Sequence, residues 1–210
     1  MSPRPRQASD EDLLKAAFLA VARRGPARLT LADVAAEAGV SAAAVVQRFG
    51  SKRALLLAMA ADVATGDRYI FPGLRSLHRS FVEALLGLAD CMAPLYGGTP
   101  SGVANTLAFL QTGLDDPHLH RHALAASDGI RAGIRALVRD AIAAGELVDA
   151  DAGRLASALQ ATLNGSLLSW AVHRKGALAA WLRRDLATVI DRYRAAHGRR
   201  RRPSAARRRP

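Results

Sequence analysis

Residues 30–53 read TLADVAAEAGVSAAAVVQRFGSKR and contain two short helix signals with almost no chain between them. Thr30 can cap the first helix, because Asp33 stands three residues later, where an acidic side chain reaches back to the helix start. Gly39 tolerates the left-handed conformation that ends a helix, and Ser41 can cap the next one. A helix, a glycine turn and a second short helix make up a helix-turn-helix unit. The stretch therefore predicts this motif, with an ordinary helical hairpin in a bundle as the alternative.

The second helix of this motif is expected to present a face of short, nearly uncharged side chains to solvent. Val45 and Phe49 lie four residues apart, so both are expected on the buried side. The expected exposed set is Ala42, Ala43, Ala44, Val46, Gln47 and Arg48. Such a face suits a helix that inserts into the major groove of DNA. Base reading is expected to rest on its only long polar side chains, Gln47 and Arg48, with methyl contacts from two of its alanines.

The segments AGVS (38–41) and FGSKRALL (49–56), together with Thr30, resemble the TetR family of bacterial transcriptional regulators. The resemblance is close over residues 10–60 and only architectural beyond them. It implies an all-α homodimer whose N-terminal three-helix helix-turn-helix domain binds a palindromic double-stranded DNA operator. A larger helical domain that binds an effector and dimerises would follow, giving about nine helices. The implied function is transcriptional regulation, most often repression that a small molecule relieves.

The resemblance also implies a mechanism and a set of DNA contacts. Effector binding would shift the helix that begins at Lys52 and spread two heads that are spaced by about 34 Å. Thr30 and Lys52 match family positions that touch the DNA backbone, at helix N-termini, where phosphates are favoured. Where the family usually has a tyrosine, this chain has Val46, and Arg48 can replace the lost contact with a charge-assisted phosphate bond. The predicted DNA-binding residues are Thr30, Ser41, Ala42, Ala43, Ala44, Gln47, Arg48, Lys52, Arg4 and Arg6.

The positive charge of the chain, +12 in total, is concentrated at its two ends. Residues 1–53 carry a net charge of +4, residues 54–196 one of +1, and residues 197–210 one of +7. We therefore predict an arm plus helix-turn-helix domain, a helical effector-binding and dimerisation domain, and a disordered basic tail over these three ranges. Arg4 and Arg6 lie in the arm and can reach a minor groove. A basic architectural protein that binds DNA without regard to sequence is the second hypothesis.

Apolar residues recur at helical spacing along most of the chain, so the predicted fold class is all-α. Gly25-Pro26 is expected to stop the first helix, and residues 67–73, which contain Pro72 and Gly73, are expected to form a loop. The expected helices span residues 10–24, 31–38, 42–49, 52–66, 74–92, 101–111, 117–144, 149–175 and 178–193.

The last two predicted helices are apolar on more than one side, which indicates a partner beyond the chain's own core. Two such helices can pair with those of a symmetry mate in a four-helix bundle, and the family resemblance implies the same arrangement. The residues expected in this homodimer interface are Leu163, Leu167, Leu182, Leu186 and Val189. An ordinary monomer core is the alternative.

An effector cavity is expected inside the second domain, because the TetR resemblance implies one among its helices. Large side chains on those helices are Phe81, Met92, Phe109 and Trp170. Few charged residues lie on the inward faces, so the unknown small-molecule effector is expected to be largely apolar. Plain core packing is the alternative for each of the four residues.

Metal binding and catalysis have little support in this sequence. His118, His120 and His122 alternate at a helix start, but only the first and third share a face, so solvated histidines are expected rather than a metal site. No catalytic constellation or phosphate-binding loop is present, and neither a cofactor nor an enzyme activity is expected. An orphan helical enzyme is the third hypothesis.

Membrane insertion and disulfide formation are also not expected. The single cysteine, Cys91, excludes an intramolecular disulfide. Residues 91–114 carry no charge, but their prolines and glycines disfavour a membrane-spanning helix. Residues 1–16 are polar and charged, which does not fit a secretory signal, so we expect a cytoplasmic protein without a membrane partner.

Overall fold

The computed structural model describes residues 8–195, and over this range the chain is helical and forms no strand. This confirms the predicted all-α fold class. Arg4, Arg6 and the predicted basic tail (197–210) lie outside the described residues. The helices are α1 (Asp10–Arg28), α2 (Leu31–Ala38), α3 (Ala42–Phe49), α4 (Lys52–Thr65), α5 (Asp67–Leu77), α6 (Phe81–Met92), η1 (Ala93–Tyr96), α7 (Pro100–Asp115), α8 (Pro117–Ala143), α9 (Ala152–His173), α10 (Leu178–Ile190) and η2 (Asp191–Tyr193).

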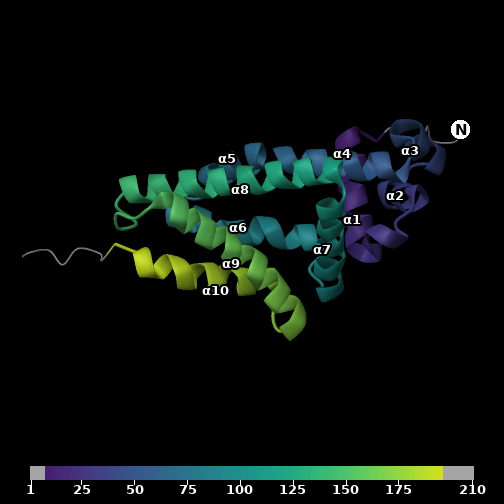
Figure 1. The fold of residues 1–210 in the computed structure, drawn as a ribbon. Helices are drawn as coiled ribbons and strands as arrows, with labels where there is room; N and C mark the ends of the chain where they lie inside the picture. The colour runs from purple at the N-terminus through teal and green to yellow at the C-terminus, as the bar shows by residue number, and fades with distance from the viewer. Residues whose placement is uncertain (1–7, 196–210) are drawn as a thin grey trace, which may run out of the picture.

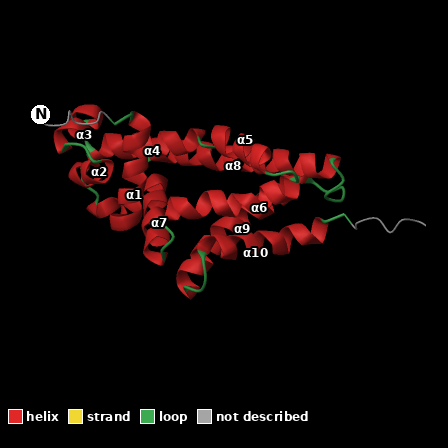
Figure 2. Ribbon diagram, turned by 180° about the vertical axis from the view of Figure 1, so that it is seen from behind, coloured by secondary structure: helices red, strands yellow, loops and turns green. Residues whose placement is uncertain are grey.

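The helices form an elongated molecule with α1, α2 and α3 gathered at one end (Figure 1). Helix α4 leads from this end along α8, and α5 continues on α8 in the same direction (Figure 1). Helix α6 lies between this layer and the α9–α10 pair (Figure 2). The described chain ends at Ala195, at the end of the molecule that is far from α2 and α3 (Figures 1 and 2).

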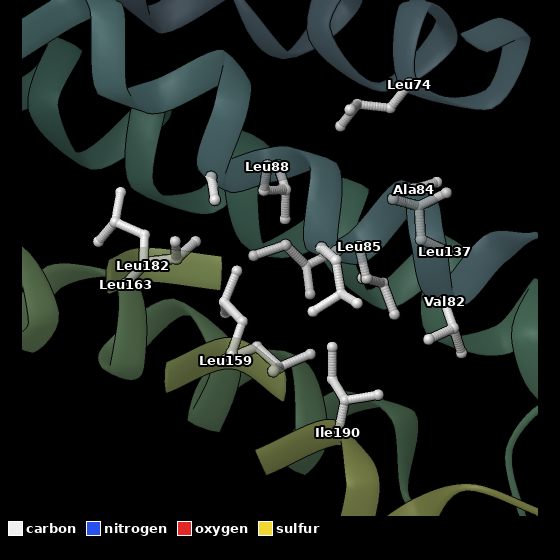
Figure 3. Packing of buried hydrophobic residues seen from close by; sticks show 14 of the residues in the cluster. Leu74, Val82, Ala84, Leu85, Leu88, Leu137, Leu159, Leu163, Leu182 and Ile190 are labelled. Carbon is white, nitrogen blue, oxygen red and sulfur yellow. The ribbon is translucent and has the colours of Figure 1, made fainter. Parts of the chain in front are cut away.

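Two separate hydrophobic cores hold the fold together. The body core lies among α5, α6, α8, α9 and α10, where Leu85 and Leu88 of α6 pack among side chains from the surrounding helices (Figure 3). Both leucines are fully buried, and each such burial contributes about 2 kcal/mol. The smaller head core is built by α1, α2, α3 and α4. Helix α4 contributes Leu55, Leu56 and Met59 to it, so this helix belongs to the head as well as to the layer on α8.

The structure corrects the prediction for residues 67–92. The predicted loop at 67–73 is the first part of α5, and the predicted helix 74–92 is divided into the end of α5 and α6. Proline disfavours a helix interior, but α5 tolerates Pro72 because Phe71 and Leu74 are buried in the body core. The Phe71 ring lies directly on Gly133 of α8, where a Cβ atom would overlap it. Tertiary packing thus overrides the local proline signal, and the described residues contain ten α-helices rather than about nine.

The expected stop at Gly25-Pro26 is a kink rather than an end. Gly25 has φ 76° and ψ 158°, which interrupts α1, and one further helical turn reaches Arg28. A proline at the start of the new turn costs no hydrogen bond, because its missing N–H would have no helical partner there. The kink lets Leu29 enter the head core before Thr30 starts α2.

A long-range cap explains why α6 begins where it does. The Ser80 hydroxyl accepts a hydrogen bond from Glu83 N at 3.2 Å, which leaves the first two amides of the helix to be satisfied. The Glu146 carboxylate, from the loop after α8, accepts from Phe81 N at 3.1 Å and from Val82 N at 2.9 Å. Burial raises the pKa of Glu146, but the hydrogen bonds from Ser80 and these two amides outweigh it, so the pKa is lowered overall.

We predict that Glu146→Gln destabilises the chain at neutral pH by about 1 kcal/mol, the usual effect of losing a helix cap. Because the folded-state pKa of Glu146 is depressed, its contribution is present above the unfolded value of about 4.3 and is lost as pH falls through the lower folded-state value. Urea unfolding at several pH values should therefore show a difference between wild type and variant that disappears in acid. Asp149→Asn removes an exposed charge from the same loop and should have no such effect. Equal loss in both variants would contradict the capping role.

Candidate nucleic-acid interface

The predicted helix-turn-helix is formed by α2, a glycine turn and α3, and its predicted caps are present. Thr30 Oγ1 accepts a hydrogen bond from Asp33 N at 3.2 Å, while Asp33 Oδ2 accepts one from Thr30 N at 2.9 Å. Gly39 ends α2 in the left-handed region, with φ 68°. Ser41 Oγ then accepts from Ala44 N at 3.2 Å at the start of α3. These local contacts fix where both helices begin and end.

The head core fixes which side of α3 faces outward. Val45 of α3 and Val34 of α2 are fully buried beneath α1, and Phe49 is partly buried beside them. As a result the predicted DNA-facing set of α3 is exposed, and its members are Ser41, Ala42, Ala43, Ala44, Val46, Gln47 and Arg48. This face lies at the tip of the molecule in Figure 1. It carries one charged side chain, Arg48, so a close approach to another surface meets little steric or electrostatic resistance.

Three of the predicted DNA-binding side chains already have partners within the chain. Lys52 Nζ donates to the carbonyl oxygen of Ala27 at 2.7 Å, which joins the start of α4 to the last turn of α1. The hydroxyl of Thr30 is used in its cap. The Arg48 guanidinium donates through Nε and Nη2 to the two carboxylate oxygens of Asp10, in the first turn of α1. The sequence did not predict this pair, because Asp10 and Arg48 are 38 residues apart.

The electrostatics of the head follow from these contacts. The hydrogen bonds from Arg48 hold the pKa of Asp10 below its usual value, and the same pair raises the pKa of Arg48. The hydroxyl and backbone amide of Thr30 lower the pKa of Asp33 in the same way. All four groups are therefore in their usual charge states at neutral pH, and the Asp10–Arg48 pair is electrically neutral as a unit.

The basic tail that follows residue 196 was predicted from sequence, and the structure fixes the point from which it starts. Val148 N donates to Tyr193 O at 2.8 Å, and Ala195 N donates to Glu146 O at 3.0 Å, so the described chain end is bound to the loop after α8. This loop lies at the end of the body that is far from α3 (Figure 1). The tail therefore begins at the opposite end of the molecule from the helix-turn-helix.

Two polar links join the head to the body in addition to the packing of α1 on α7 and of α4 on α8. Asn105 Nδ2 of α7 donates to Ala22 O of α1 at 2.9 Å, beside the Gly25 kink. Arg53, in the first turn of α4, forms an ion pair with Asp116, the N-cap of α8. This ion pair is the main reason that the pKa of Asp116 is lowered to about 2, and bonds from the amides of His118 and Leu119 add to the effect.

The structure does not gather the four predicted effector-pocket residues around one cavity. Phe81, Met92 and Trp170 belong to the body core, whereas Phe109 packs against the head core. Trp170 is 3% exposed, and its Nε1 donates to Gly176 O at 3.1 Å. Within the described residues these four side chains serve as core, which was the alternative, and they stay candidates for an effector site only by proposal.

The predicted dimer residues need a correction, because four of them fill the chain's own core. Leu163, Leu167, Leu182 and Leu186 are at most 3% exposed within the single chain, so a partner cannot reach them. The sequence could not separate their inward face from the outer one, because both faces of α9 carry apolar residues. Val189 is different, since it lines an open hollow between α9 and α10. The hollow is lined by Thr162, Gly165, Ser166, Ser169, Asp185, Thr188 and Val189.

Over residues 8–195 no group of three or more histidine, cysteine, aspartate or glutamate side chains is arranged to hold a metal ion. His118 instead lies 2.8 Å from a guanidinium nitrogen of Arg121. In the same range no helix combines the length and the apolar character needed to cross a membrane. Cys91 is partly buried, and burial raises the pKa of its thiol.

Comparison with known proteins agrees with this architecture. Residues 13–59 match the family described as bacterial regulatory proteins, tetR family, and residues 81–206 match the BetI-type transcriptional repressor C-terminal family. The search of curated proteins gave no match.

Several solved structures share the fold at low sequence identity. The reduced form of Escherichia coli NemR is 18% identical with a TM-score of 0.69, over 90% of this chain and 98% of that chain. FadR from Bacillus subtilis, in complex with stearoyl-CoA, is 16% identical with a TM-score of 0.66, over 87% and 98%. A transcriptional regulator from Saccharomonospora viridis, in complex with choline, is 23% identical with a TM-score of 0.66, over 86% and 94%. With both family matches in the helix-turn-helix and in the body, the chain belongs to the TetR family of bacterial transcriptional regulators.

Proposed function

We propose that this TetR-family regulator is a homodimeric repressor that binds a palindromic DNA operator through α3 and leaves it when a small molecule binds the body. The observation that carries the proposal is the exposed, almost uncharged face of α3, fixed by its Ser41 cap and the burial of Val45. The match of residues 81–206 to a repressor C-terminal family supports repression rather than activation.

The proposed DNA contacts follow the predicted set, with Gln47 and Arg48 reading bases and Thr30 and Lys52 near phosphates. Lys52 would exchange its bond to Ala27 O for a phosphate oxygen, or hold α1 in place while its charge acts over a longer distance. Arg4 and Arg6 are proposed to reach the adjacent minor groove from the arm. The proposed division into a head (1–53) and a body (54–196) needs one qualification, because α4 contributes to both cores.

Dimerisation is proposed through the outer faces of α9 and α10, with a second copy of this chain covering the hollow that Val189 lines. Small residues at Thr162, Gly165 and Ser169 permit a close approach of backbones. The neighbouring Leu168 and Val172 are 56% and 71% exposed, which is unusual for a surface without a partner. A C2 dimer would bring the same face of each copy together.

The effector is proposed to be a small, largely apolar molecule held among the body helices near Phe81, Met92, Phe109 and Trp170. Two structural relatives bind stearoyl-CoA and choline, respectively, so this fold accommodates ligands of very different size and charge. The body lining here carries few charges, which favours an apolar ligand.

The link from effector to DNA is proposed to run through α4. Its first turn is tied to the N-cap of α8 by the Arg53–Asp116 pair, while its middle packs in the head core. A shift of α8 would therefore move α4 and the helix-turn-helix together.

The first test concerns base reading. Gln47→Ala should lower operator affinity by about 1–3 kcal/mol and relax the preference at one base pair of each half-site. Titrations should use an operator selected from genomic DNA and single-base-pair variants of it. Gln111→Ala, the same change on the exposed face of α7, is the matched control and should have no effect. Unchanged affinity and preference in Gln47→Ala would refute the assignment.

The second test concerns the dimer. A Cβ atom at Gly165 would meet no atom within 4 Å, so Gly165→Glu fits the single chain, and the added side chain favours helix. In a C2 interface the new charges of both copies would approach one another, and we expect the dimer dissociation constant to rise at least about tenfold. Asn164→Glu places the same charge on α9 outside the hollow and should leave the dimer intact. Sedimentation that shows a wild-type monomer at micromolar concentration would refute the proposal.

The third test concerns the connection through α4. Asp116→Asn keeps an N-cap side chain for α8 but removes the charge that binds Arg53. Amide hydrogen exchange in the first turns of α4 should become faster, while α8 stays protected. Asp115→Asn removes the neighbouring, exposed charge and is the control. Because the pKa of Asp116 is depressed to about 2, the difference between the two variants should persist at pH 5. Equal exchange in both variants would contradict a connection through this pair.

A further inference from the structure

The Asp10–Arg48 pair occupies only one edge of the arginine fork. Nε and Nη2 donate to the carboxylate, and no described residue accepts a hydrogen bond from Nη1. The two side chains are 52% and 57% exposed, so the free end of the guanidinium, formed by Nη1 and the second hydrogen of Nη2, faces solvent. Arg48 therefore keeps two parallel donors in a fixed orientation.

The chemistry of this free edge favours a base over a phosphate. The charge of Arg48 is already compensated by Asp10, and a phosphate that approached Arg48 would also approach the Asp10 carboxylate, which repels it. The edge of a base carries no net charge and is not repelled. Two parallel N–H donors match the O6 and N7 acceptors of guanine in the major groove, which is the commonest specific arginine contact.

The pair also lowers the cost of ordering the side chain. A free arginine loses several rotatable bonds when it binds, and a guanidinium already held by a carboxylate loses less of this freedom. Asp10 comes from α1, which is fixed by the head core, so its position relative to α3 does not depend on DNA. Holding the side chain in this way is the task of a positioning residue.

We propose that Asp10 is a specificity-determining residue, which orients and neutralises Arg48 so that its free edge reads a guanine in each operator half-site. Without Asp10, the freed guanidinium takes the nearest phosphate in any sequence. This inference rests on the proposed operator binding and adds to it a residue outside the helix-turn-helix.

The test compares full-length wild type with Asp10→Asn and the matched control Glu11→Gln, which removes the next acid of the same helical turn without touching Arg48. Each protein is titrated with the selected operator, with operators in which single guanines are replaced, and with scrambled duplex, at 50 and 200 mM salt. Asp10→Asn should lose about tenfold preference at one guanine per half-site. It should also steepen the salt dependence on scrambled duplex by about 0.9 for each phosphate gained. Glu11→Gln should change neither.

Two further variants separate positioning from a structural effect. Asp10→Glu keeps the carboxylate and should retain the guanine preference, whereas Arg48→Lys keeps the charge without the fork and should lose it. Far-ultraviolet circular dichroism and melting establish that each variant is folded. In the Arg48→Lys background, Asp10→Asn should cause no further loss of preference.

The contrary outcomes are distinct. If Asp10→Asn raises affinity for operator and scrambled duplex alike with an unchanged base preference, Asp10 is merely a competitor of phosphate and the proposal is overturned. The same follows if Asp10→Asn behaves like Glu11→Gln while wild type remains selective. If wild type itself binds operator and scrambled duplex equally, operator recognition fails, and both proposals fall together.

Discussion

The burial of α1 on two sides is the constraint on which the rest of the structure depends. One side of this helix covers Val34 and Val45 and so closes the head core, while another side lies along α7 of the body. Ala22 is buried at the boundary, its carbonyl oxygen bound by Asn105 of α7. Because the same helix holds both neighbours, the exposed face of α3 has a defined orientation relative to the body. A head on a flexible linker would have no such orientation, and a change in the body could not move it in a directed way.

The contacts around the head share one physical pattern, in which α1 supplies groups that hold α3 and α4. Asp10 binds Arg48 near one end of α1, and the carbonyl oxygen of Ala27 binds Lys52 near the other. Exposed ion pairs of this kind add little to stability, so their value lies in fixing geometry. The body adds Arg53–Asp116 at the start of α4, where a small displacement is carried to the DNA-facing helices with little loss.

Local signals allowed the sequence to predict the helix-turn-helix, while longer-range contacts explain what it missed. Thr30, Asp33 and Gly39 act within a few residues of themselves, and their roles are the predicted ones. Ser80 and Glu83 carry the spacing of a helix start, a signal that was available but was outweighed by the continuous apolar pattern around it. The carboxylate of Glu146 completes that start from 64 residues away, a distance that no local pattern reveals.

The candidate site was predictable in part for the same reason. The exposed face of α3 follows from helical periodicity, but the Asp10–Arg48 and Arg53–Asp116 pairs join residues 38 and 63 apart. Periodicity also marked Leu163 and Leu186 as buried without deciding whether the chain or a partner buries them, and the single chain does. The same helices have a second face around Gly165 and Val189, which the sequence did not distinguish from the first.

The central claim is that a symmetric pair of α3 helices reads DNA sequence, and selection of genomic fragments by the purified full-length protein tests it most directly. The account predicts enrichment of one palindromic site whose half-site centres lie about one helical turn of DNA, or a small multiple of it, apart. Enrichment of a non-repeated site would contradict the symmetric pair. Retention of fragments in proportion to their length, without any shared sequence, would contradict sequence reading altogether and leave only charge-driven binding.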